Sequence, residues 1–338
     1  MKIVIVTQAL LNNYGGVLQN FALQRVLSRL GHNPITFDFK QKNHYDSLLK
    51  VLPRRILYSV IKILFGKKIN ARSFPRYQKR SFTMEKFVKE NISVTNGVKK
   101  YKPENMTCLG AGAVVVGSDQ VWRPKYNHFL EDMFLAFTQN LNIKRISYAA
   151  SFGVDEWEYT PKQTRICSAL AKKFDAISVR EESGVRLCKE HLGVDATWVL
   201  DPTLLLKKED YLNLCQEVPV NDNRFMAVYV LNMNESVRES YEAIAKERNL
   251  EIKLFEADAK ASLTIPEWLA MFRDASYVVT DSFHGTVFSI IFEKEFKCIY
   301  NETRGAARFE SLLNLYNSGK LEEMRQFSLN WLKNALES

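Results

Sequence analysis

The stretch Tyr277–Phe292, YVVTDSFHGTVFSIIF, joins an apolar run to a short polar turn and then to a second apolar run. The first run, Tyr277–Thr280, predicts a buried strand, and Val287–Phe292 predicts an apolar helix. The turn places His284 at the start of that helix, where unpaired N–H groups favour phosphate and carboxylate. A histidine at this place can transfer a proton near neutral pH, or it can simply cap the helix.

Strand and helix patterns alternate along the rest of the chain. A first strand–helix–strand unit is predicted at Lys2–Thr7, Val17–Leu30 and Pro34–Phe39. Further strands are predicted at 113–116, 145–149, 176–179, 197–200, 225–231, 251–255 and 296–300. Further helices are expected at 235–249, 266–274, 308–317 and near 321–336. This alternation predicts an α/β fold of two doubly wound, Rossmann-like domains that face a cleft.

The length and composition are typical of two soluble domains. The chain has 338 residues, of which 46% are hydrophobic, so it can bury substantial cores. We expect an N-terminal domain at 1–202 with a basic insertion at about 40–100, a C-terminal domain at 203–320 and a terminal helix at 321–338. No apolar run approaches the roughly 20 residues that span a bilayer. Five scattered cysteines without CxxC spacing argue against disulfides and a zinc site, and favour the cytoplasm.

The positive charge is concentrated in one segment. Residues 40–80 hold twelve lysines and arginines and one acid, Asp46, which is a net charge of +11. Because the whole chain has a net charge of +9, the other residues together carry −2. Pro53 can open a helix there with Leu57 and Leu64 on one face. A basic amphipathic helix suits an anionic membrane surface, which predicts peripheral contact with the inner face of the membrane. Alternatively, its apolar face packs on the protein's own core. Nucleic-acid binding is not expected, because no recognition motif accompanies the charge.

Polar clusters follow six of the predicted strands. They lie at 12–16, 117–120, 150–153, 180–181, 201–202 and 281–285. In open α/β sheets, ligands bind beyond the carboxyl ends of the strands. One such cluster is ordinary loop chemistry, but six predict a shared polar cleft.

Each cluster also has a purely structural explanation. Gly15-Gly16 can form a tight turn or let the backbone approach a phosphate or a sugar, and it lacks the full GxGxxG dinucleotide fingerprint. Asp119 can cap the following turn or contact substrate. Arg180 can pair with Glu181 or Asp175, or it can bind an anion. Arg304 and Arg308 flank a loop of small residues, where either can reach an anion or stay solvated.

Seven segments carry a resemblance to a known family. They are NYGGVLQ (13–19) with ALQ (22–24), VGSDQVW (116–122), SYAASFG (147–153), ISVRE (177–181), VLDPT (199–203), TDSFHGT (280–286) and RFESLL (308–313). Together, and in this order, they resemble the polysaccharide pyruvyl transferase family over residues about 1–315.

The resemblance implies a glycosyltransferase-B-like fold and transfer of a pyruvyl group from phosphoenolpyruvate. The product would be a pyruvate ketal across two hydroxyls of a sugar. The acceptor would be a surface polysaccharide, such as exopolysaccharide or capsule, or its lipid-linked precursor. No cofactor beyond the co-substrate phosphoenolpyruvate and no metal are implied. The N-terminal domain is then expected to hold the acceptor and the C-terminal domain the donor.

The same resemblance assigns roles to single residues. His284 is expected to be the general acid at the donor methylene, and Asp119 to orient or deprotonate the acceptor hydroxyl. Donor contacts are expected from Arg180, Arg308, Arg304, Ser282 and Gly285, and acceptor contacts from Asn13, Gly15 and Gly16.

The sequence departs from the family pattern at one position. Some members carry an arginine two residues before the histidine, where this chain has Ser282. The anion contacts must then come from elsewhere. Two other functions stay open: a nucleotide-sugar-dependent glycosyltransferase that uses the same cleft, and a non-catalytic protein that binds glycolipid precursors.

Overall fold

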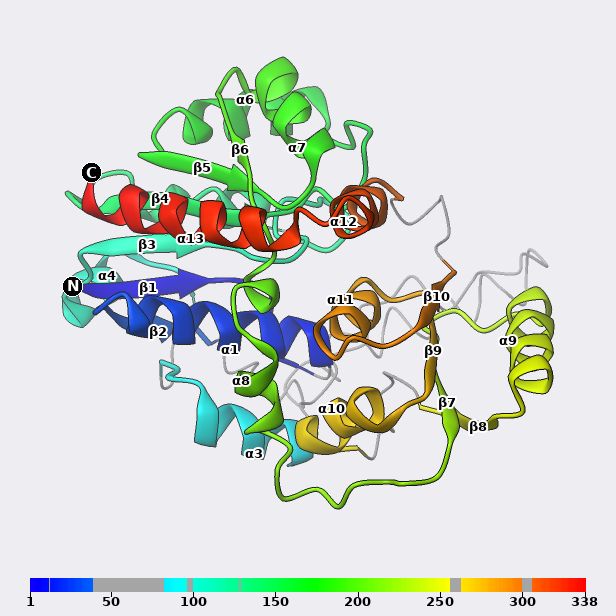
Figure 1. The fold of residues 1–338 in the computed structure, drawn as a ribbon. Coiled ribbons are helices and arrows are strands. Elements are labelled where there is room, and N and C mark those ends of the chain that lie inside the picture. The colour runs from blue at the N-terminus through cyan, green and yellow to red at the C-terminus, as the bar shows by residue number, and fades with distance from the viewer. Residues whose placement is uncertain (12, 39–81, 96–99, 128, 256–262, 300–305) are drawn as a thin grey trace, which may run out of the picture.

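Two parallel β-sheets with helices packed against them make up the molecule (Figure 1). The structure is a computed structural model, and it describes residues 1–338 except 12, 39–81, 96–99, 128, 256–262 and 300–305. The basic helix expected from Pro53 onward and Arg304 lie outside the described residues. The two parallel sheets confirm the predicted α/β class with two doubly wound units.

The first sheet has the strand order β2-β1-β3-β4-β5-β6. Its strands are β1 (Lys2–Val6), β2 (Asn33–Thr36), β3 (Ala113–Val116), β4 (Lys144–Ala150), β5 (Ala176–Val179) and β6 (Thr197–Trp198). Strand β1 pairs with β2 on one side and with β3 on the other, all in parallel. The chain therefore changes the direction of strand addition between β1 and β3, and doubly wound sheets bind their ligands at such a point.

Helices cover both faces of the first sheet, which explains why its strands are apolar on both faces. Ile3 and Ile5 belong to one hydrophobic cluster and Val4 and Val6 to another, because successive side chains point to opposite faces. The first cluster includes side chains of α1 (Tyr14–Arg29) and α3 (Phe82–Asn91). The second includes side chains of α4 (Pro103–Leu109), α5 (Leu130–Met133), α6 (Pro161–Ala171) and α7 (Glu182–Leu187).

The second sheet has the strand order β10-β9-β7-β8. Its strands are β7 (Phe225–Tyr229), β8 (Glu251–Leu254), β9 (Tyr277–Thr280) and β10 (Phe296–Cys298). The helices of this unit are α9 (Glu235–Arg248), α10 (Ile265–Asp274) and α11 (Phe283–Ile291). A 3-10 turn, η5 (Pro202–Leu204), and the short helix α8 (Lys208–Leu212) connect it to the first sheet.

The two units pack directly on each other. The rings of Tyr14, at the start of α1, and Trp268, in α10, stack with centroids 5.3 Å apart, and the Tyr14 hydroxyl donates to the Leu263 carbonyl oxygen at 2.7 Å. One hydrophobic cluster runs from Ile3 through this contact into α11. The carboxyl end of β1 therefore lies against the helices of the second unit.

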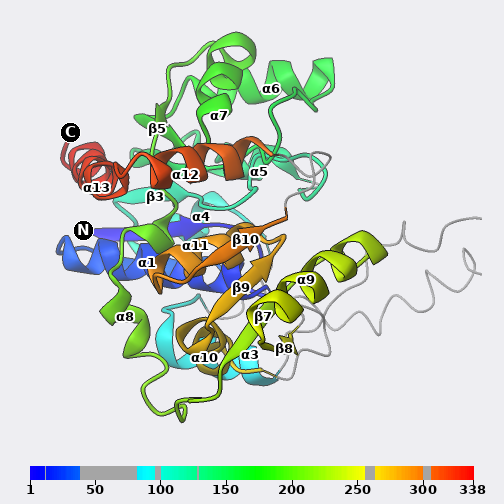
Figure 2. The same cartoon turned by 45° about the vertical axis from the view of Figure 1, so that its right-hand side comes forward.

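The chain returns to the first sheet after β10. Helix α13 (Leu321–Glu337) lies along that sheet, and α12 (Ala307–Asn317) lies between α7 and α11 (Figures 1 and 2). Ser328 in α13 accepts a hydrogen bond from the Leu200 amide at 3.0 Å. Helix α12 contacts both units, so its contacts do not assign it to one of them. The domain boundaries proposed at 202 and 320 therefore stay predictions.

Candidate functional site

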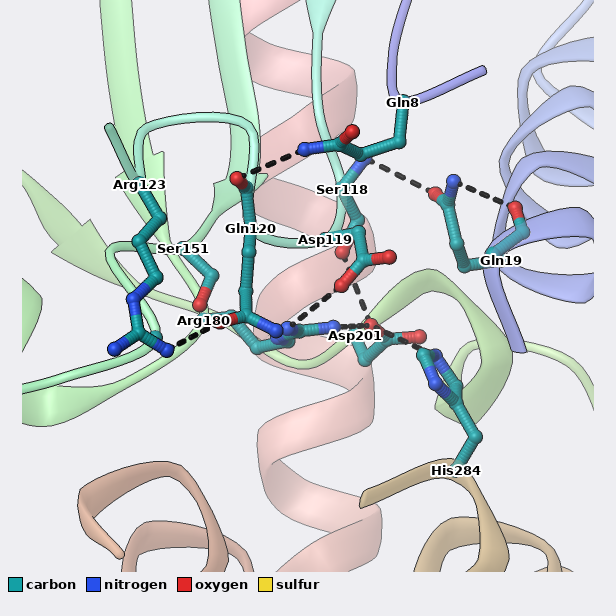
Figure 3. A network of polar contacts seen from close by, with 12 residues as sticks. Gln8, Gln19, Ser118, Asp119, Gln120, Arg123, Ser151, Arg180, Asp201 and His284 are labelled. Carbon is teal, nitrogen blue, oxygen red and sulfur yellow. Dashed lines mark hydrogen bonds and ion pairs between the residues drawn. The ribbon is translucent and has the colours of Figure 1, made fainter. Parts of the chain in front are cut away.

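Asp201 is the centre of a buried polar network that joins the two units (Figure 3). Its Oδ2 accepts from Ser118 Oγ at 3.0 Å and from Arg180 Nη1 at 2.7 Å. Its Oδ1 accepts from the amide and the hydroxyl of Thr203, at 3.0 and 2.6 Å. His284 Nε2 lies 3.8 Å from the same Oδ2, which is too long for a hydrogen bond but close enough for charge attraction.

These neighbours decide the protonation state of Asp201. Burial alone would raise the pKa of its carboxyl, but His284, Arg180 and Thr203 outweigh burial and hold that pKa well below its ordinary value. Asp201 is therefore an anion inside the protein, compensated by Arg180 and available to a protonated His284.

Arg180 is fixed by two carboxylates. Its Nη1 donates to Asp201, and its Nη2 donates to Asp119 Oδ1 at 3.3 Å. Burial would lower the pKa of the guanidinium, but Asp201 and Asp119 raise it. The side chain is only 1% exposed, and its Nε has no hydrogen-bond partner among the described residues.

His284 stands in the first turn of α11, as the sequence predicts. The helix begins there because Ser282 caps it, and the Ser282 side chain accepts from the Gly285 amide at 3.3 Å. Gly285 allows the helix to approach β9, since a Cβ on it would lie 2.2 Å from Thr280 Oγ1. The hydroxyl of Ser282 and the amide of Gly285 are thus occupied with each other. His284 Nε2 is buried and has no hydrogen-bond partner within the described part of the chain.

The start of α1 meets His284 across the junction of the two units. A Cβ on Gly15 would lie 2.1 Å from His284 Nδ1, so only glycine permits this approach. Asn13 caps α1, and its side chain accepts from the Gly16 amide at 3.1 Å. Asn13, Gly15 and Gly16, the three residues expected to bind the acceptor, therefore fix the start of α1 and its contact with His284.

Arg308, in the first turn of α12, is the second cation of the site. Its guanidinium carbon lies 5.7 Å from the centroid of the Phe283 ring, and that of Arg180 lies 4.5 Å from the same centroid. Burial and the nearby Arg180 lower the pKa of Arg308 to about 10. Its Nε is enclosed without a partner among the described residues, although the side chain as a whole is partly exposed. A cation in this state favours an added anion.

Glu181 supports the loop that borders the network. Its Oε1 accepts from Ser151 Oγ and from the amides of Phe152 and Gly153, at 3.0, 2.8 and 3.2 Å. Burial raises the pKa of this carboxyl, against the opposing effect of Arg180. Its other oxygen has no partner in the described ranges.

A second set of contacts anchors the turn after β3. Gln19 Nε2 donates to Thr7 Oγ1 and to the Gly16 carbonyl oxygen, and Gln19 Oε1 accepts from the Ser118 amide at 3.0 Å (Figure 3). Asp119 follows with a φ of 69°, in the left-handed region. The end of β3 is thereby locked to the start of α1.

The structure brings His284, Asp119, Arg180, Arg308 and Gly15 together at the junction of the two units. Sequence reasoning missed Asp201, Ser118 and Gln19 as site residues. The available signals were the polar clusters after predicted strands, which include Ser118 and Asp201, and the segments that carry the family resemblance, which include all three residues. Among the described residues, no group of three or more histidine, cysteine and acidic side chains could hold a metal ion. No described helix is long and apolar enough to cross a membrane.

Comparison with known proteins gives one family. The family described as "Polysaccharide pyruvyl transferase" matches residues 13–303. No curated protein matches the chain in sequence.

Several solved structures are similar over nearly their full lengths. A glycosyltransferase from Rickettsia africae ESF-5 is 10% identical with a TM-score of 0.45, covering 99% of this chain and 94% of its own. A UDP-GlcNAc 2-epimerase from Neisseria meningitidis is 11% identical with a TM-score of 0.48, covering 100% and 98%. A putative UDP-N-acetylglucosamine 2-epimerase from Listeria monocytogenes is 13% identical with a TM-score of 0.47, covering 98% and 94%.

Proposed function

Because the chain belongs to the polysaccharide pyruvyl transferase family, we propose that it transfers the pyruvyl group of phosphoenolpyruvate to two hydroxyls of a sugar. The product is a pyruvate ketal on a surface polysaccharide or its lipid-linked precursor. In this reaction the donor methylene takes a proton, and one hydroxyl adds to the central carbon with loss of its own proton. The bond between that carbon and the phosphate oxygen then breaks, phosphate leaves, and the second hydroxyl adds to the same carbon and closes the ring with loss of its proton.

The observation that carries the proposal is the pair of guanidinium groups around Phe283. Arg308 carries a positive charge without a carboxylate hydrogen-bonded to it among the described residues, directly beside the buried Arg180. A donor carboxylate or phosphate would relieve the repulsion between these cations. Arg308 thus supplies the cation that Ser282 does not, since Ser282 is the helix cap. Charged hydrogen bonds of this kind contribute roughly 1.5–3 kcal/mol each.

Arg180 has a different role in this proposal from the one that the family resemblance assigns. Its two terminal nitrogens are bound to Asp201 and Asp119, and its Nε is buried. We therefore assign the direct anion contact to Arg308, while Arg180 adds positive potential and holds the two carboxylates.

His284 is the general acid in this proposal, and Asp201 is the residue that positions it. Asp201 is held by four hydrogen bonds, and its Oδ2 lies 3.8 Å from His284 Nε2. The first turn of α11 places the same histidine at the positive end of a helix, where phosphate binds readily. Asp119 orients the acceptor hydroxyl from the first unit.

The test is phosphate release from phosphoenolpyruvate over a panel of saccharides, with the ketal product detected by mass spectrometry. His284→Ala should lower kcat by roughly 10²–10⁴, the usual contribution of a general acid. The control is His191→Ala, a partly exposed histidine that stacks on Trp157 in the first unit. A turnover number unchanged by His284→Ala contradicts the assignment.

A further inference from the structure

An exposed pair of aromatic rings lies on the loop that follows the Ser118–Asp119 turn. Tyr126 is 49% exposed and Phe129 is 75% exposed. Of the three residues expected to bind the acceptor, Gly15 and Gly16 are buried in the junction between the units. Asn13 is exposed, but its side-chain oxygen accepts from the Gly16 amide. A sugar ring therefore needs a further contact surface.

The loop holds Tyr126 in a fixed position. Asn127 Nδ2 donates to the carbonyl oxygens of Gln120, Val121 and Arg123, at 3.0, 2.7 and 3.2 Å, and its Oδ1 accepts from Gln8 at 3.2 Å. The Tyr126 amide donates to the Arg123 carbonyl oxygen at 3.1 Å. Such a loop presents its side chains without a large loss of conformational entropy on binding.

Arg123 covers part of the Tyr126 ring. Its guanidinium carbon lies 5.4 Å from the ring centroid. Its Nε and Nη2 donate to Glu158 at 2.9 and 3.0 Å, and its Nη1 donates to Gln120 Oε1 at 3.2 Å. Arg123 itself is 3% exposed, so it is a fixed support. The ring is thus supported by a buried cation and still half exposed to solvent.

Tyr126 also belongs to the neighbourhood of the donor cation. Its phenol is close enough to Arg308 to raise the pKa of that guanidinium, although burial and Arg180 lower it overall. The loop is joined to the end of β1 as well, because Gln8 Nε2 donates to the Gln120 carbonyl oxygen at 3.0 Å. Arg123, which lies against the Tyr126 ring, contacts the side chain of Gln120, and Gln120 directly follows Asp119 in the chain. A molecule on the Tyr126 ring would therefore lie beside the loop that carries Asp119.

We propose that the exposed face of Tyr126 is the platform on which the acceptor sugar stacks, with Phe129, three residues further along the chain, as a secondary contact. Pyranose rings present an apolar C–H face and a rim of hydroxyls, and an amphipathic aromatic ring complements both. The platform would hold the sugar face while its hydroxyls point toward Asp119 and the donor. The identity of the ligand as an acceptor rests on the proposed function.

Saturation-transfer NMR with a panel of methyl pyranosides on the full chain tests this platform without catalysis. At least one methyl pyranoside should give a signal with the wild-type chain and with Tyr126→Phe, which keeps the ring. Tyr126→Ala should weaken its binding about tenfold, the effect of one good contact, and Phe129→Ala by less. The control is Phe327→Ala, a 47% exposed ring on α13, which should change nothing.

The platform is contradicted if no pyranoside binds, or if binding survives Tyr126→Ala. A loss of binding in Tyr126→Phe would also contradict it, because the hydroxyl and not the ring would then be responsible. Phosphoenolpyruvate binding, measured on the same variants by thermal shift, separates this proposal from the reaction. Tyr126-dependent pyranoside binding without phosphoenolpyruvate binding supports the platform and removes the donor assignment.

Discussion

At the scale of single residues, the contact between Gly15 and His284 defines how the two units meet. The imidazole lies so close to the Gly15 backbone that no side chain fits between them. The histidine proposed as the general acid is therefore also a packing element, and its position depends on a glycine far away in the sequence.

Gly15→Ala should destabilise the protein by about 1–3 kcal/mol, because the added methyl group overpacks the junction. In a His284→Gly background the same substitution should destabilise the protein much less. The three atoms nearest to the added methyl group all belong to the His284 side chain. Urea unfolding of the four variants of this double-mutant cycle measures the difference. An equal cost in both backgrounds means that the two residues do not meet as described.

Asp201 makes the stability dependent on pH. Asp201→Asn should cost about 3–5 kcal/mol at pH 7, because Arg180 loses a buried partner. The pKa of Asp201 is lowered in the folded protein, so the ionised carboxylate stabilises the fold fully above about pH 5. That contribution is lost as the pH falls below the unfolded value of about 3.9 toward the folded one.

Urea unfolding at pH 7, 5 and 3.5 measures the gap in unfolding free energy between the wild type and Asp201→Asn. This gap should therefore be smallest at pH 3.5. The matched control is Asp195→Asn, since the Asp195 side chain is 87% exposed and pairs only with Lys189 on the surface. A gap that stays constant or widens at pH 3.5 contradicts a lowered pKa.

Single site residues were predictable where they stand in a recognisable turn. His284 and Asp119 follow apolar strands and precede helical or polar segments, so their place at the sheet edge is readable from the sequence. Asp201 follows a strand in the same way, but Asp-Pro is also a common turn. Its importance comes from Ser118, Arg180 and His284, which are distant in sequence.

At the scale of elements, the apolar runs predicted the strands well, because parallel strands buried on both faces leave continuous apolar segments. Helix α1 begins at Tyr14 and not at Val17, since Asn13 caps it and two glycines enter its first turn. The packing of α13 on the first sheet was not readable. An amphipathic helix indicates which side is buried, but not which of two sheets covers it.

The basic segment at 40–80 makes a prediction that depends on its charge alone. Its +11 should bind the chain to vesicles containing anionic lipid, since each basic residue near such a surface contributes roughly 1 kcal/mol. Neutralising Arg54, Arg55, Lys62, Lys67 and Lys68 should abolish co-sedimentation. Neutral vesicles are the lipid control, and neutralising five surface lysines elsewhere is the protein control. If the neutralised variant still co-sediments with anionic vesicles as the wild type does, this segment is excluded as a membrane contact.

At the scale of the whole molecule, the two units contribute different parts of one site. The first supplies Asp119, Arg180 and Asp201, the second supplies His284, and α12, which contacts both, supplies Arg308. Two doubly wound units follow from the alternation of strands and helices. The chemistry of the site does not follow from the fold, since such folds host many reactions.

The most direct test of the proposed reaction is the thermal stability of the chain with phosphoenolpyruvate and with a panel of nucleotide sugars. A ligand at a hundred times its Kd stabilises the folded protein by about 2.7 kcal/mol. For a domain of about 150–250 residues this raises the Tm by about 5–10 °C. We predict this shift with phosphoenolpyruvate for the wild type and for Arg186→Ala, whose side chain is 52% exposed on α7, and its loss in Arg308→Ala. A shift only with a nucleotide sugar, or a phosphoenolpyruvate shift that survives Arg308→Ala, would contradict the account.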